Sequence, residues 1–126
     1  MHKNLCTLAV ATELKSLGYN GLTYHFYDKK GNLEYLEFPD EYNRSDQTIA
    51  VPTMYEALDW LFDKGVSIQI LNRPNKKWHV MIYDVPKERL ETEGDNVWYP
   101  HVVENEDRIV AINQALLLYL VQKTKF

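Results

Sequence analysis

Histidine is the residue of this chain best suited to acid–base or metal chemistry, because its side chain changes charge near neutral pH. The chain contains four histidines, at His2, His25, His79 and His101. None has a second histidine at a metal-binding spacing, and no H-E-x-x-H motif occurs. His25 and His79 each lie in a segment predicted to be a strand. If these strands share a sheet, a carboxylate such as Asp28 or Asp84 could complete a metal or acid–base site. The alternative is two surface or hydrogen-bonded sheet histidines.

Basic side chains gather on two predicted hairpin turns, and they are Lys29, Lys30, Arg73, Lys76 and Lys77. If both turns lie at one end of a sheet, they form a basic rim that could dock an acidic partner or phosphate groups. Solvated turns without a partner are the alternative, because exposed lysines are ordinary there. The strand aromatics Trp78 and Tyr83 fit core packing, and the other interpretation is a stacking surface for a base.

The sequence lacks several motifs that are typical of catalytic or ligand-binding sites. It contains no phosphate-binding glycine loop, no nucleophile elbow, and no calcium-loop spacing around Asp28. The single Cys6 excludes an intramolecular disulfide and disfavours a cysteine-based zinc site. We therefore predict no catalytic residues, no metal ligands and no cofactor. A non-enzymatic protein fits this sequence better than an enzyme, although neither is excluded.

Length and composition narrow the classes of protein. The 126 residues suit one domain over 1–126, and 45% hydrophobic residues suffice for a core. A formal net charge of -4 disfavours nucleic acid as a partner, since phosphate binding usually needs a basic face. The longest apolar run, Ala115–Val121, is too short to span a bilayer, and no signal peptide is recognisable. We expect a cytoplasmic protein without a membrane partner.

The segment from Pro52 to Asp84 is the predicted centre of the fold. Thr53 and Glu56 have the spacing of a capping box, which predicts a helix from Met54 to Lys64. Gly65 ends this helix. A strand over 66–70 and a return strand over 78–83 then form a hairpin.

The first half repeats this plan of helix, glycine stop and hairpin. Thr7 caps a helix over 8–17 that Gly18 ends, and strands follow over 22–27 and 33–38. The polar residues 39–51 are predicted to be a loop. Residues 86–100 form a long acidic connection.

The last predicted helix, from Asp107 to Lys123, is apolar nearly all round. One face carries Ala111, Ile112, Ala115, Leu116, Tyr119 and Leu120. Such a helix is buried on more than one side, either by other helices of the domain or by a second subunit. The residues that we predict to form an interface are Trp60, Val110, Leu117, Leu118 and Val121.

The order of several short motifs resembles a family. These motifs are Gly18-Tyr19-Asn20, Ala50-Val51-Pro52-Thr53, Trp60-Leu61, Lys77-Trp78 and Ala111-Ile112-Asn113-Gln114-Ala115-Leu116. Together they are similar to a group of short proteins common in gut Bacteroidetes and in their phages and integrated elements. The resemblance carries no activity or catalytic residues. It implies a mobile element or its host as the biological context.

These observations predict an α+β fold, with an antiparallel sheet of about four strands from two hairpins and three helices mainly on one face. The first functional hypothesis is a homo-oligomeric or partner-binding interaction protein. The alternative is a small nucleic-acid-binding protein or nuclease that uses the basic turns. A third hypothesis, a small-molecule enzyme, predicts a deep pocket beside His25 or His79.

Overall fold

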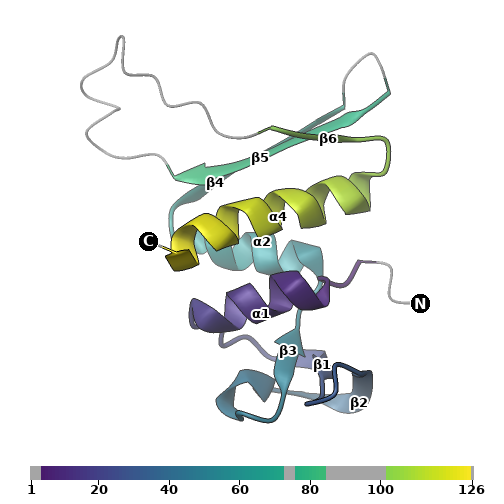
Figure 1. The fold of residues 1–126 in the computed structure, drawn as a ribbon, viewed down its shortest axis with the longest axis vertical. Coiled ribbons are helices and arrows are strands. Elements are labelled where there is room, and N and C mark those ends of the chain that lie inside the picture. The colour runs from purple at the N-terminus through teal and green to yellow at the C-terminus, as the bar shows by residue number, and fades with distance from the viewer. Residues whose placement is uncertain (1–3, 73–75, 85–101, 126) are drawn as a thin grey trace.

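The computed structural model describes residues 4–72, 76–84 and 102–125 (Figure 1). The predicted acidic connection over 86–100 lies outside the described residues. The elements in chain order are α1 (Leu8–Ser16), β1 (Thr23–Tyr27), β2 (Leu33–Asp40), the 3-10 helix η1 (Tyr42–Arg44), β3 (Ile49–Val51), α2 (Met54–Asp63), β4 (Val66–Asn72), β5 (Trp78–Asp84), β6 (Val103–Asn105) and α4 (Arg108–Lys125).

The predicted α+β class is confirmed, with three α-helices in the described part of the chain, but the predicted single sheet is wrong. The strands form two separate antiparallel sheets, ordered β2-β1-β3 and β4-β5-β6. Figure 1 shows one sheet on each side of the helices, so the helices lie between two sheets and do not cover one face of a single sheet.

The error arises from two strands of only three residues each. β3 lies in the segment predicted to be a loop, where Val51 pairs with His25 of β1. β6 lies just before the last helix, where Asn105 pairs with Trp78 of β5. Three residues are too few for a recognisable alternation of apolar and polar side chains. Each hairpin therefore completes its sheet with a strand from its own half of the chain.

The ends of α1 are as predicted. The Thr7 side chain accepts a hydrogen bond from the Val10 backbone N–H at 3.3 Å. Gly18 has a φ of +92°, and the next N–H, from Tyr19, donates to the Leu14 carbonyl at 3.0 Å. Only glycine adopts this left-handed backbone without strain, so the helix ends there and Tyr19 turns back into the core.

The capping box of α2 is confirmed. Thr53 Oγ1 accepts from the Glu56 N–H at 3.1 Å, and Glu56 Oε1 accepts from the Thr53 N–H at 2.8 Å. Gly65, with a φ of +90°, leads directly into β4. The helix and the second sheet therefore form one continuous unit, with α2 in contact with β4.

The predicted apolar face of the last helix is also confirmed. Ile112, Leu116 and Leu120 of α4 have no exposed surface. The helix contacts α1 and also contacts β5 and β6, so its buried side chains are covered by this chain itself. Complete burial of a leucine or isoleucine side chain stabilises a fold by about 1.5–3 kcal/mol, so α4 is a main source of stability.

The two sheets contribute unequally to this core. The second sheet supplies Val66, Val80, Ile82 and Val103 to the cluster of buried hydrophobic residues. No residue of β1, β2 or β3 belongs to that cluster, although β3 contacts α1. The first sheet lies outside this cluster, although Ala50 and Val51 of β3 are buried.

Candidate functional site

Strand β2 is an edge strand whose eight residues are all exposed. Four of them are large and apolar, namely Leu33, Tyr35, Leu36 and Phe38. Phe38 is 80% exposed and Leu36 is 51% exposed. An edge strand carries unpaired backbone groups, and proteins commonly protect such edges. Here the edge strand carries four exposed apolar side chains beside a proline and two glutamates of the kind that protect an edge.

Part of β2 arches away from β1. Thr23 pairs with Asp40 and His25 pairs with Tyr35, so one residue of β1 faces four residues of β2, residues 36–39. Bulges of this kind redirect side chains at sheet edges. This bulge exposes Leu36 and Phe38, which cannot pack on β1.

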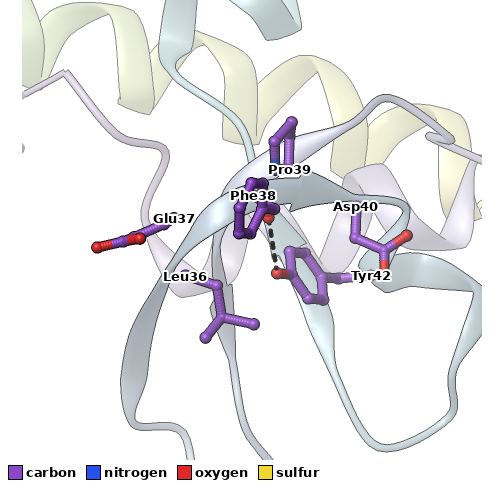
Figure 2. Close-up of a pocket in the computed structure, with 6 residues that line it drawn as sticks. All are labelled: Leu36, Glu37, Phe38, Pro39, Asp40 and Tyr42. Carbon is purple, nitrogen blue, oxygen red and sulfur yellow. Dashed lines mark hydrogen bonds between the residues drawn. The ribbon is translucent and has the colours of Figure 1, made fainter.

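A hollow of about 390 Å³ lies against the arch, and it is lined by Leu36, Glu37, Phe38, Pro39, Asp40 and Tyr42. In Figure 2 the Tyr42 ring lies beside Phe38, whereas Glu37 points away from both. Apolar side chains thus form the surface, and carboxylates stand at its margin. Such a hollow can receive an apolar side chain next to a cationic one.

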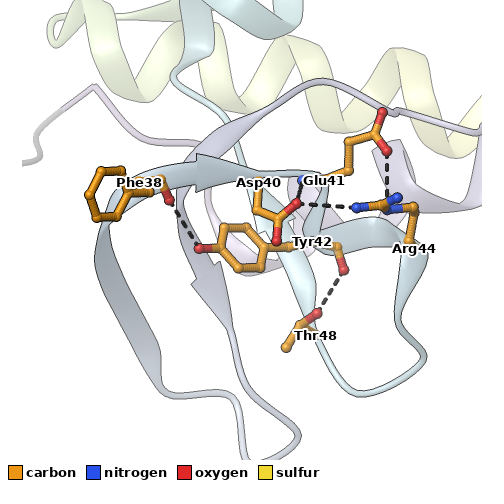
Figure 3. A network of polar contacts seen from close by, with 6 residues as sticks. All are labelled: Phe38, Asp40, Glu41, Tyr42, Arg44 and Thr48. Atoms are coloured by element: carbon orange, nitrogen blue, oxygen red, sulfur yellow. Dashed lines mark hydrogen bonds and ion pairs between the residues drawn. The ribbon is translucent and has the colours of Figure 1, made fainter.

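Tyr42 fixes the floor of this hollow. Its ring stacks on Phe26 with a centroid distance of 4.4 Å, and its hydroxyl donates to the Phe38 carbonyl at 3.5 Å. Thr48 Oγ1 donates to the Tyr42 carbonyl at 2.6 Å (Figure 3). Partial burial and, secondly, the charge of Asp40 raise the pKa of the Tyr42 hydroxyl above its ordinary value.

The segment that carries Tyr42 is tied to α1 and β3. Lys15 Nζ donates to the carbonyls of Ser45 and Thr48, both at 2.7 Å. The Asn43 amide donates to the Tyr19 carbonyl at 2.9 Å and accepts from the Ala50 N–H at 2.8 Å. These bonds hold the polar segment, which was predicted to be a loop, in one conformation.

The surface around the hollow is acidic. Arg44 pairs with Asp40 at 3.3 Å and with Glu41 at 3.1 Å (Figure 3). Glu34 and Glu37 form no ion pair within the described part of the chain. Two of the four carboxylates are therefore left to attract a cationic partner.

The two strand histidines lie in different sheets, so they do not meet across one sheet. His25 lies in β1, where it is buried and its ring is 5.0 Å from that of Tyr35. His79 lies in β5 and its Nε2 is 2.8 Å from Glu104 Oε1 in β6. Asp84 is engaged elsewhere, with Tyr119 and Lys123 of α4.

A second hollow, of about 500 Å³, lies beside His25 and is lined by Asn4, Leu5, Tyr24, His25, Val51, Thr53 and Glu56. One Glu56 oxygen is occupied by the cap of α2. Among residues 4–72, 76–84 and 102–125 no group of three or more potential ligands could hold a metal ion. Burial, aided by the charge of Glu56, raises the pKa of Cys6 to about 12, so its thiol is no nucleophile at neutral pH.

The predicted basic rim requires both hairpin turns to lie at one end of the same sheet, and the two turns belong to different sheets. Lys29 and Lys30 lie on the turn of the first sheet, whereas Lys76 and Lys77 lie beside the second sheet on the other side of the helices (Figure 1). Arg73 lies outside the described residues. The two turns therefore do not share a sheet. Trp78 packs against the core under Arg108, as expected for core packing.

The predicted interface residues fall into different environments. Trp60 packs against the core, with Tyr19 at 5.3 Å and Lys64 Nζ at 4.5 Å from its ring. Leu117 also packs against the core, and Val121 is half-buried. Val110 and Leu118 are exposed on α4. Association through these residues stays a prediction.

Sequence reasoning missed the surface of β2, although one signal was available. A strand packed on one face alternates apolar and polar residues. Residues 33–38 break this rule, because Leu33 and Tyr35 occupy odd positions and Leu36 and Phe38 even positions. Apolar residues on both faces of an edge strand indicate a surface that another chain can cover.

Comparisons with family models, curated proteins and solved structures found no match. The resemblance to the Bacteroidetes group therefore stays a prediction. No helix among the described residues is both long enough and apolar enough to cross a membrane.

Proposed function

We propose that this protein is a non-enzymatic interaction domain that binds another polypeptide through β2 and η1. The observation that carries this proposal is an eight-residue edge strand in which every residue is exposed and four are large and apolar. Large exposed apolar surface on a folded domain often marks an interaction site.

The hydrogen bonds of the η1 segment, which follows β2, support the same function. Lys15, Asn43 and Thr48 hold η1 through hydrogen bonds to backbone groups. A surface that is ordered before binding loses less conformational entropy when a partner arrives. The Phe38 ring and the hollow beside it are thus presented on a preorganised support.

Other functions have less support from the described residues. The hollow beside His25 lacks a reactive thiol and a metal-ligand cluster. The basic turns lie in separate sheets, and the exposed edge is acidic, which opposes contact with nucleic-acid phosphates. The family resemblance favours a mobile element or its host as the setting of the interaction.

Selection from a displayed library of random peptides tests the proposal. The wild type should enrich peptides that the double variant Leu36→Ser/Phe38→Ser no longer binds. Phe62→Ser is the matched control, because Phe62 is 68% exposed but lies on α2. The proposal fails if no peptide is enriched, or if both variants bind the enriched peptides as the wild type does.

Self-association is the competing form of this interaction, and light scattering separates the two. A monomeric mass for the wild type together with enriched peptides identifies a different chain as the partner. A dimeric mass that the double variant reduces to a monomer identifies a second copy.

A further inference from the structure

The chemistry of β2 also indicates what kind of chain it binds, an inference that rests on the proposed function. We infer that β2 accepts an extended segment that carries both basic and bulky apolar residues. This segment adds to the first sheet as a fourth strand, next to β2.

The backbone of β2 provides the first argument. In an antiparallel sheet, every second residue of an edge strand directs its N–H and C=O away from its neighbour. Added strands use these groups for main-chain hydrogen bonds. The other edge, β3, has only three residues and contacts α1 and η1, so β2 is the longer available edge.

Pro39 sets one limit of the added strand. Proline has no N–H to donate, so a ladder of hydrogen bonds on β2 ends before it. The partner therefore pairs with residues 33–38, the part that carries all four exposed apolar side chains.

The carboxylates of β2 and η1 indicate which side chains the partner carries. Glu34 and Glu37 form no ion pair within the described residues, and Asp40 and Glu41 share the single guanidinium of Arg44. Opposite charges facing each other across two strands stabilise the pair, and like charges destabilise it. Lysine or arginine side chains of the partner thus fit beside the glutamates.

The same charges argue against a second copy of this chain. Pairing of β2 with β2 would bring the acidic side chains of both copies into one sheet, and no basic residue occurs within Leu33–Asp40. The apolar residues of the partner instead meet Leu36, Phe38 and Tyr42, where the hollow of about 390 Å³ can receive one side chain.

Three labelled peptides test this inference by fluorescence anisotropy with the intact protein. The first is a valine-rich peptide with two lysines three residues apart, which matches the spacing of Glu34 and Glu37. The second replaces every lysine with glutamate, and the third is the first peptide N-methylated at alternate residues along one edge. The first should bind, with an affinity that falls as salt rises, and the other two should bind at least about tenfold more weakly.

Two double variants test whether the peptide binds at β2. Glu34→Gln/Glu37→Gln should weaken the lysine–valine peptide by about tenfold at low salt, because two facing charge pairs are lost. Lys29→Gln/Lys30→Gln is the control for altered charge on the same sheet, and it should not weaken binding. Backbone amide shifts on adding the peptide should concentrate in residues 33–38.

The inference is overturned if the acidic or N-methylated peptide binds as well as the first, or if the glutamate variant binds normally. The library selection separates this failure from failure of the proposed function. Enriched peptides that need Phe38 but lack basic residues would overturn the partner chemistry alone, whereas no enriched peptide would overturn both.

Discussion

Both sheets are three-stranded and antiparallel, but only the second contributes side chains to the cluster of buried hydrophobic residues. The second sheet buries Val80 and Ile82 against α4. The first sheet leaves all of β2 in solvent. A small sheet needs a covered apolar face to be stable on its own. This difference is consistent with the proposed division of roles, in which the second sheet provides stability and the first sheet binds a partner.

The first sheet is held by polar bonds in place of a large apolar face. Lys15 and Asn43 connect the η1 segment to α1, to the Tyr19 turn and to β3. Stacking of Phe26 on Tyr42 adds a local apolar contact. A site built in this way keeps its shape without covering the residues that a partner would bind.

Truncating a core side chain and truncating a β2 side chain should differ most clearly in their effects on the free energy of unfolding. We expect Leu116→Ala to lower the free energy of unfolding by about 3 kcal/mol, through lost burial and a residual cavity. Phe38→Ala removes a larger side chain, but it should change the free energy of unfolding by less than about 0.5 kcal/mol because Phe38 is exposed. Urea unfolding measures both values, and a loss of similar size for Phe38→Ala would contradict the division of roles.

Loss of the Lys15 bonds should loosen the first sheet before the second. Lys15→Met removes two bonds to backbone carbonyls and should cost about 1 kcal/mol. Hydrogen exchange should accelerate in β1 and β3 more than in β5. Lys29→Met, on an exposed turn, is the control and should leave exchange unchanged, and uniform acceleration over both sheets would show that they open together.

Local signals in the sequence predicted much of the helical part. The pair Thr53 and Glu56 and the stop at Gly18 depend on contacts within a few residues, so sequence spacing is sufficient to recognise them. The helical spacing of apolar residues in the sequence predicted the apolar face of α4, and the structure confirms this face. These features need no knowledge of the distant partner.

Features that depend on distant pairing were not predictable in the same way. His79 meets Glu104 only because the register of β5 and β6 places them opposite each other. β3 is recognisable only once its partner β1 is known. The candidate site arises where β2 departs from the regular register, so a pattern based on regular strands misses it.

A pH-dependent effect tests how the second sheet is joined to α4. Asp84 at the end of β5 accepts hydrogen bonds from Tyr119 and Lys123, both at 2.7 Å. Burial opposes the charged carboxylate, but these two bonds outweigh it, and the pKa of Asp84 lies below its ordinary value. The group therefore contributes stability above its unfolded pKa, and this contribution is lost as the pH falls through the lower folded pKa.

Asp84→Asn should lower the unfolding free energy at neutral pH by less than about 1 kcal/mol, because this carboxylate is nearly half exposed. The variant should also flatten the fall in stability below about pH 4, where an ordinary aspartate begins to take up a proton. Asp63→Asn, at the exposed end of α2, is the control. Thermal unfolding at a series of pH values from acid to neutral measures how the stability of each variant depends on pH. If the Asp84 variant follows the wild type throughout, the contact between β5 and α4 depends on apolar packing alone.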